Sequence, residues 1–126
     1  MTLEQAIFQA DELKPNQIPR AEKISWLSHL DKRIFREIIQ QHDPDPAYPD
    51  AFSGYTQDTP PDTELLAKAP YDELYLYCLQ MRADLVNQEY DKYNNDLLLF
   101  SAAWGAFARA YHREHRFRLT PPWLRF

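Results

Sequence analysis

Apolar residues recur along this chain at the three- and four-residue spacing of amphipathic helices. The first predicted helix begins behind Thr2 and ends before Pro15, because a proline cannot continue a helix. Thr2 and Gln5 have the spacing of a capping box, in which each side chain accepts a hydrogen bond from the backbone of the other. A second helix is predicted over residues 19 to 41, with Pro19 in its first turn.

Two more helices are predicted in the second half of the chain. The third begins at Pro70, and beyond it the apolar stripe changes phase, so we place a break at Asn87, a residue that tolerates the left-handed conformation. The fourth helix then covers residues 89 to 115, although one continuous helix is an alternative. Gly105 inside this helix indicates close contact with another helix. The predicted core positions of the third helix are Leu74, Cys78, Met81 and Leu85.

Residues 43 to 69 are predicted to form a long loop, because five prolines and five aspartates between residues 43 and 62 exclude a helix. Loops of this length are usually functional or disordered. Tyr48, Phe52 and Tyr55 are candidate partner-binding residues in it, although these rings could equally pin the loop to the core of their own domain. Gly54 is expected to take a positive φ in a turn.

These elements predict an all-α fold. The expected four-helix domain covers residues 1–115, with two N-terminal helices, the proline-rich loop and two long C-terminal helices. The chain has 126 residues, which suits one domain. It has only 2 glycines, whereas hairpins and barrels use glycine freely in turns, so a β-rich fold is excluded. No apolar run approaches the roughly 18 to 20 residues that span a membrane.

Residues 116–126 form a predicted C-terminal tail in which arginines alternate with apolar residues around two prolines. Such a segment either folds back on its domain or fills grooves on another subunit, where Trp and Arg are favoured anchors. We expect docking onto another subunit. The candidate partner-binding residues of the tail are Arg116, Phe117, Arg118, Leu119, Trp123, Leu124 and Phe126.

Charge is distributed unevenly over the chain. Residues 109–126 contain five arginines and one glutamate, which is a net charge of about +4. Because the formal net charge of the whole chain is −5, the rest of the chain carries about −9. A protein that grips nucleic acid needs clustered lysines and arginines to neutralise phosphates. The acidic body therefore disfavours DNA binding, and the basic end is either a solvated tail or a segment that docks on an acidic partner surface.

No residue pattern of a known catalytic site occurs in the sequence, and two glycines cannot build a phosphate-binding loop. Cys78 lies in the core stripe, and no nearby histidine or basic cluster indicates a reactive thiolate, so it is expected to be structural. As the single cysteine it has no disulfide partner within the chain, which favours a reducing cytoplasm. His112 and His115 could share a metal, but no third ligand is specified by spacing. We expect no catalytic residues, no cofactor and no metal, and hence a protein that is not an enzyme.

Five short phrases of the sequence carry a family resemblance. They are ADELKPN at residues 10–16, EKISWL at 22–27, DTELL at 62–66, PYDELY at 70–75 and YNN at 93–95. Together they resemble small proteins encoded in phages and prophages of Gram-positive bacteria, the head–tail connectors or head-completion adaptors of long-tailed phages. The resemblance covers about residues 2 to 115 and leaves the tail outside.

What the resemblance implies is a structural virion protein that assembles as a ring of about a dozen subunits. Its partners would be further copies of itself, the portal protein, and a tail-proximal connector or stopper protein. DNA would pass through without specific binding, and an acidic lumen with residues such as Glu89 and Asp91 would repel its phosphates. The protein would be found at the head–tail interface of the virion, in the bacterial host cytoplasm during assembly, and not in a membrane.

Two other functions stay open from the sequence. A cytosolic helical adaptor or antitoxin-like binder would form a small complex of fixed composition with its partner. A helix-turn-helix regulator would bind DNA in a salt-dependent manner, but the acidic body makes this function the less favoured one.

Overall fold

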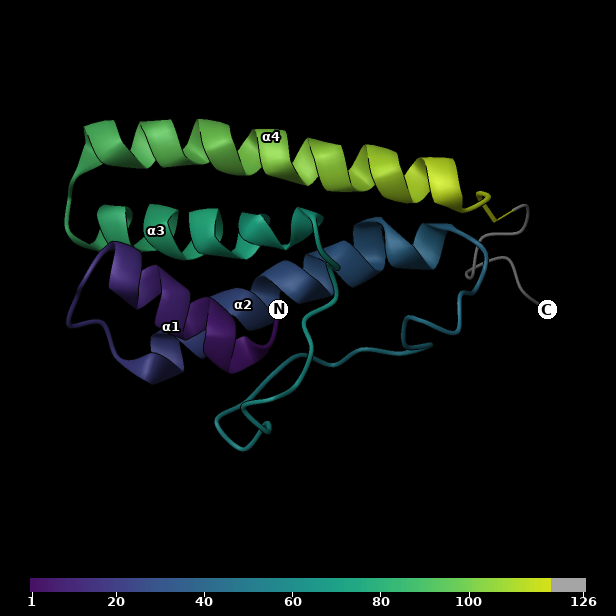
Figure 1. The fold of residues 1–126 in the computed structure, drawn as a ribbon, viewed down its shortest axis with the longest axis horizontal. Helices are drawn as coiled ribbons and strands as arrows, with labels where there is room; N and C mark the ends of the chain where they lie inside the picture. Colours follow the sequence, from purple (N-terminus) through teal and green to yellow (C-terminus); the bar gives the residue numbers. More distant parts are fainter. Residues whose placement is uncertain (119–126) are drawn as a thin grey trace.

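Four α-helices make up most of the computed structural model, which describes residues 1–118. The described part of the chain contains no β-strand, so the predicted all-α class is confirmed. Two single-turn 3₁₀ helices cover Ile39–Gln41 and Tyr71–Glu73. The α-helices are α1 (Leu3–Leu13), α2 (Arg20–Glu37), α3 (Leu74–Val86) and α4 (Tyr90–Glu114) (Figure 1).

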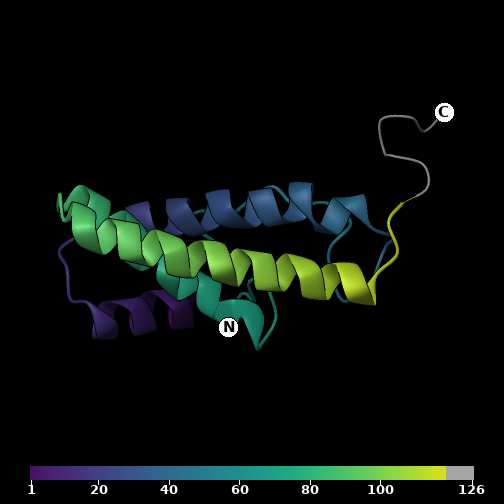
Figure 2. The same ribbon diagram turned by 90° about the horizontal axis from the view of Figure 1, so that it is seen from above.

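Helix α3 is at the centre of the domain, in contact with each of the other three α-helices. It runs antiparallel to α4, to which a short turn joins it, while α1 and α2 cover its other sides (Figure 2). The α3–α4 turn and the C-terminal end of α4 consequently lie at opposite ends of an elongated molecule (Figure 1). We call the first the turn end and the second the tail end.

Local sequence signals locate the helix boundaries well. Gln5 donates its backbone N–H to the Thr2 hydroxyl over 3.1 Å, and Thr2 donates its own N–H to the Gln5 side chain over 2.9 Å, so the predicted capping box is confirmed. Pro19 is the N-cap of α2. Two of the predicted helices are α-helical over a shorter range than predicted. A 3₁₀ turn follows α2 and another precedes α3, as is frequent at helix termini.

Two predictions of backbone detail are wrong. The break between α3 and α4 lies where the apolar stripe changes phase, but the left-handed residue is Gln88, with φ of 58°, and not Asn87. Gly105 does not mark a close contact between helices. A Cβ atom added there would meet only the side chain of Arg109, one turn further along the same helix, at 3.0 Å.

The hydrophobic core draws on all four helices and on the end of the long loop. Leu3, Leu27 and Leu74 are fully buried, and so is Leu65 of the loop. The predicted core position Leu85 is a correction. Ala83 and Asp84 occupy the buried side of the last turn of α3, and Leu85 is 43% exposed beside them.

The long loop is tied to the start of the chain and to α2. Leu3 donates its backbone N–H to Thr63 over 2.9 Å, and Leu65 donates to Met1 over 3.0 Å. Gly54 has a φ of 99°, which confirms the predicted turn, and a Cβ atom there would overlap the side chain of Ser28. The loop is therefore packed along a defined path against its own domain.

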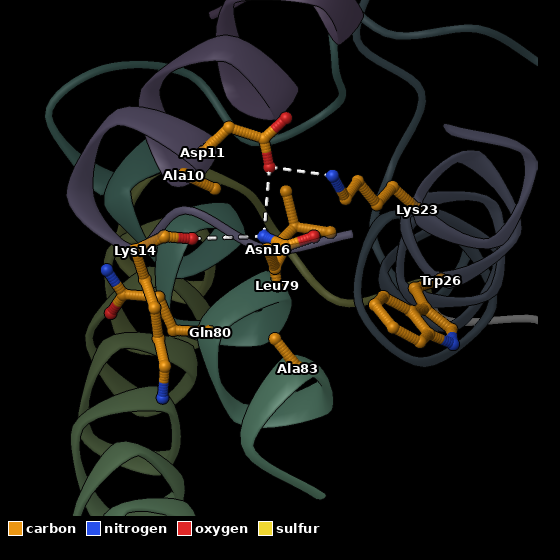
Figure 3. A pocket seen from close by; sticks show the side chains of 9 residues that line it. All are labelled: Ala10, Asp11, Lys14, Asn16, Lys23, Trp26, Leu79, Gln80 and Ala83. Carbon is orange, nitrogen blue, oxygen red and sulfur yellow. Dashed lines mark hydrogen bonds and ion pairs between the residues drawn. The ribbon is translucent and has the colours of Figure 1, made fainter. Parts of the chain in front are cut away.

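A polar contact fixes the junction of α1 and α2. Asp11 accepts hydrogen bonds from Lys23, over 2.7 Å, and from the side-chain amide of Asn16, over 3.2 Å (Figure 3). Lys23 is 6% exposed, so its ammonium group is buried with a carboxylate partner. The hollow beside these residues measures about 10 Å³, roughly the room that one water molecule needs. It is a packing gap and not a ligand site.

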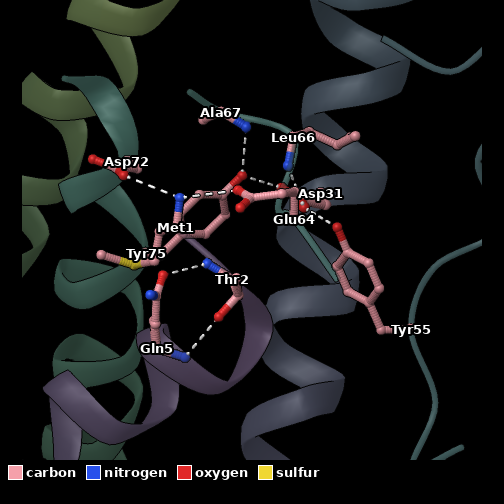
Figure 4. A network of polar contacts seen from close by, with 10 residues as sticks. All are labelled: Met1, Thr2, Gln5, Asp31, Tyr55, Glu64, Leu66, Ala67, Asp72 and Tyr75. Carbon is pink, nitrogen blue, oxygen red and sulfur yellow. Dashed lines mark hydrogen bonds and ion pairs between the residues drawn. The ribbon is translucent and has the colours of Figure 1, made fainter. Parts of the chain in front are cut away.

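The carboxylate of Asp31 joins α2, the loop and α3. It accepts hydrogen bonds from the hydroxyl groups of Tyr55, over 2.5 Å, and Tyr75, over 2.6 Å, and from the backbone N–H of Leu66, over 3.1 Å (Figure 4). Tyr75 in turn accepts the backbone N–H of Ala67 over 2.7 Å. Asp31 is 0% exposed. Burial raises its pKa to about 6, although the hydrogen bonds act in the opposite direction.

We expect the substitution Asp31→Ala to lower the free energy of unfolding by about 3 to 5 kcal/mol, because it leaves three buried donors without an acceptor. Urea denaturation followed by circular dichroism measures this loss. Asp50→Ala is the matched control, since Asp50 is exposed in the same loop and its loss should change stability by no more than about 0.5 kcal/mol. Equal stability of the two variants would contradict the role given to Asp31.

Candidate functional site: the two ends of the molecule

At the tail end, the chain leaves α4 and pairs with the segment that follows α2. Asp43 donates its backbone N–H to Arg116 over 2.8 Å, and Arg118 donates to Gln41 over 3.0 Å. The Arg118 side chain donates a further hydrogen bond to the His42 carbonyl over 2.8 Å. Residues 116–118, predicted to begin a docking tail, are thus bound to their own domain. This corrects the boundary placed at residue 116.

His115 joins the end of α4 to the long loop. Its Nε2 lies 2.6 Å from Asp45 and its Nδ1 lies 2.9 Å from the carbonyl of Tyr111, so both ring nitrogens face acceptors. Burial by itself would lower the pKa of His115, but these hydrogen bonds outweigh it and raise the pKa above 6.5. The pKa of Asp45 is lowered, first by the backbone N–H of Ala47 and then by His115.

Aromatic rings surround this ion pair. His115 stacks on Tyr111 with ring centroids 3.7 Å apart, and Tyr48 meets Tyr111 edge-on at 5.2 Å. His42 stacks on Phe117 at 4.5 Å, and Phe117 is still 55% exposed. We call this group the tail clasp. Its members are His42, Asp45, Tyr48, Tyr111, His115 and Phe117.

The loop aromatics predicted to bind a partner have different positions in the structure. Tyr48 is half-buried in the tail clasp, and Phe52 packs against Phe35, with centroids 6.2 Å apart. Tyr55 is 8% exposed and bonded to Asp31, so its assignment to a partner surface is corrected: the ring pins the loop to the core.

The tail residues divide into three groups. Arg116 and Phe117 are exposed at the tail end, and Arg118 is half-buried there. The predicted partner-binding residues Leu119, Trp123, Leu124 and Phe126 lie outside the described residues.

The side chains that could take part in catalysis or bind a metal have surroundings that indicate a structural role. Cys78 is buried, and burial raises the pKa of its thiol to about 11, which disfavours the reactive thiolate. His115 is already engaged by Asp45 and Tyr111. Over residues 1–118, no group of three or more His, Cys, Asp or Glu side chains is arranged to hold a metal ion.

The turn end exposes apolar side chains, which the sequence analysis did not identify as a surface. They come from the ends of α1 and α3 and the start of α4, and their exposed fractions lie between 43% and 63%. One of them, Val86, lines a cleft of about 350 Å³ together with Ile18 and Trp26, among others, whereas Leu13 and Tyr90 line separate hollows. The phase change of the apolar stripe was the available signal, because residues on either side of it cannot all face one core. The exposed residues are Leu13, Leu85, Val86 and Tyr90.

The turn end is also acidic. Its two segments, residues 10–14 and 84–96, hold six carboxylates and two lysines. Lys14 forms ion pairs with Asp84, which is fully buried, and with Glu89, over 2.8 Å. The pKa of Glu89 is lowered, chiefly by its hydrogen bond from Lys14. The remaining carboxylates, such as exposed Asp91, give this apolar surface a negative border.

A third apolar surface lies on the outer side of α4. Leu98 is 70% exposed and Leu99 is 48% exposed, and they follow Tyr90, the first residue of α4, by eight and nine residues. Isolated exposed leucines are common on monomers, whereas exposed apolar residues that gather in groups mark interaction sites. The turn end, where four such residues gather, is therefore the stronger candidate.

None of the helices within residues 1–118 has the length and the apolar character that crossing a membrane requires. No protein-family model, no curated protein and no solved structure matches this chain. The proposed function is therefore based on the two ends of the molecule and on the sequence.

The tail clasp is expected to weaken as pH rises. The pKa of His115 is higher in the folded protein than in the unfolded chain. Its contribution to the stability of the tail clasp is therefore complete below about pH 6.5 and is lost as the pH rises through the folded pKa. Hydrogen exchange measured near pH 6 and near pH 9, corrected for intrinsic rates, should show lower protection of the Asp43 and Arg118 amides at the higher pH. His115→Gln should abolish this pH dependence, and His29→Gln, at an exposed position of α2, should preserve it. Equal protection in the wild type at both pH values would contradict the assignment.

Proposed function

We propose that this protein is a structural subunit of a phage virion, a head–tail connector that joins copies of itself into a ring between portal and tail. The observation that carries the proposal is the grouping of exposed apolar side chains on a well-anchored helical domain, above all at the turn end. The resemblance of residues 2 to 115 to connector proteins supports the same function.

A ring subunit needs two different surfaces, because a contact repeated around a rotation axis joins one patch to another patch. The elongated domain has two unlike ends (Figure 1). The turn end combines apolar residues with carboxylates, and the C-terminal residues 109–126 contain five arginines. This arrangement favours assembly of like subunits over a single self-complementary contact.

The polar groups that join the elements of the domain also support a structural role, in which the surfaces of the subunit keep a fixed shape. Asp31 holds the loop, Lys23 holds the α1–α2 junction and His115 holds the tail end. Each of these groups has a partner within the domain. In the proposal they keep the surfaces of a ring subunit in fixed relative positions.

We further propose that DNA passes the assembled ring without specific binding, since carboxylates in the lumen would repel its phosphates. Of the two residues expected there, Asp91 is exposed, whereas Glu89 is paired with Lys14 and Lys92. Asp91 therefore carries more of the proposed repulsion than Glu89.

Native mass spectrometry and negative-stain images of the purified chain, alone and mixed with a phage portal protein, test the proposed function. We expect a closed ring, either of the chain alone or on the portal. A small complex of fixed composition with a different protein would contradict the connector function and favour an adaptor. A gel shift with duplex DNA that is lost at high salt would favour a regulator instead. A gene neighbourhood with capsid genes upstream and tail genes downstream is the matching genomic expectation.

A further inference from the structure

The turn end and the last residues of the chain offer complementary chemistry at opposite ends of the molecule. We infer that residues 119–126 of one copy bind the turn end of a second copy, so that subunits associate head to tail. This inference rests on the proposed function for its biological setting, and it goes further by naming the two surfaces that meet.

Trp123 cannot reach the α3–α4 turn of its own copy. Helix α4 has 25 residues, so about 36 Å separates its two ends. Arg118 is fixed at the tail end by its hydrogen bonds to Gln41 and His42. Trp123, the fifth residue after Arg118, lies at most about 18 Å from it when the chain is fully extended. Contact between Trp123 and the α3–α4 turn therefore requires a second molecule.

The composition of the segment matches the surface. Residues 119–126 contain four large apolar residues and Arg125, and no Asp or Glu side chain. The turn end contains four exposed apolar residues, and its carboxylates outnumber its lysines by six to three when Lys23, the partner of Asp11, is counted. Apolar burial and opposite charge thus favour the same contact, with charge also setting its orientation. The apolar residues of the segment are Leu119, Trp123, Leu124 and Phe126.

The cleft at the turn end suits an aromatic anchor. It is open, its volume is about 350 Å³, and it lies between Val86 on α3 and Ile18 and Trp26 on the other side. Trp and Arg dominate the binding energy of many interfaces when they enter such hollows. Trp123, preceded by two prolines that reduce the freedom of the segment, is the residue that we place there.

A contact of this kind is heterologous, because the patch on one copy differs from the patch on the next. Each bound copy leaves one free turn end and one free C-terminal segment. The association therefore continues until it closes into a ring, which fits the proposed connector. A twofold symmetric dimer would instead use both patches at once and stop.

Sedimentation velocity of the full-length chain over a range of concentrations, at low salt, tests the inference. We expect concentration-dependent association of the wild type that weakens at high salt. Val86→Asp at the turn end and Trp123→Ala in the segment should each weaken association by about tenfold or more. Leu98→Asp places the same charge on the exposed outer side of α4 and should leave association unchanged.

Mixing the two defective variants tests whether the segment of one copy meets the turn end of another, and growth of the wild type beyond a dimer distinguishes a head-to-tail contact from a twofold symmetric one. The Val86→Asp chain keeps an intact segment, and the Trp123→Ala chain keeps an intact turn end. One productive contact remains between them, so the mixture should form 1:1 heterodimers and nothing larger, although each variant alone is monomeric. Circular dichroism of each variant verifies that the helices are retained.

Three results would overturn the inference. They are a wild type that stays monomeric at every concentration, a Leu98→Asp variant as defective as Val86→Asp, and a mixture that forms no heterodimer. In each case the connector function is judged separately by the ring on the portal. A ring that assembles with Val86→Asp as well as with the wild type would refute the inference and leave the proposed function standing.

Discussion

The fold depends on one buried carboxylate. Asp31 accepts hydrogen bonds from Tyr55 and Leu66 of the loop and from Tyr75 of α3, and it is itself part of α2. An ionised or protonated carboxyl group without such partners would be costly in the core, so each donor is as necessary as the acceptor. The network converts a 27-residue proline-rich connection into a fixed part of the domain. It thereby holds α2 and α3 in the relative position on which the core packing relies.

A rigid middle gives the two ends of the molecule separate functions. The tail clasp fixes Arg118 at one end, and the Lys14 ion pairs with Asp84 and Glu89 brace the other. Since α4 spans the distance between them, residues 116–118 are tied down at the end of the molecule opposite the apolar turn end. The same separation that prevents an intramolecular contact favours an intermolecular one. Assembly in this account follows from the length of one helix and from where the chain is tied down.

Much of the fold was accessible to sequence reasoning because its signals are local. A capping box, two prolines and a change of stripe phase located the helix ends and the break near Gln88 to within a few residues. The Asp31 network was not accessible, since its side-chain partners are 24 and 44 residues away along the chain and no spacing rule joins them. The turn end was missed for a related reason. Leu85 continues a helical apolar stripe, but in the structure Ala83 and Asp84 take the buried side of the last turn of α3.

Disulfide trapping between copies tests most directly the central claim, that this protein acts by joining its two ends across neighbouring molecules. Cys78 is buried with a raised thiol pKa, so Val86→Cys in one chain and Leu124→Cys, beside the retained Trp123, in another introduce the reactive thiols. Under mild oxidation, the account predicts a mixed disulfide dimer that forms much faster than either homodimer. Homodimers of the Val86→Cys chain that form as fast as the mixed species, or no trapping at a concentration where the wild type associates, would contradict it.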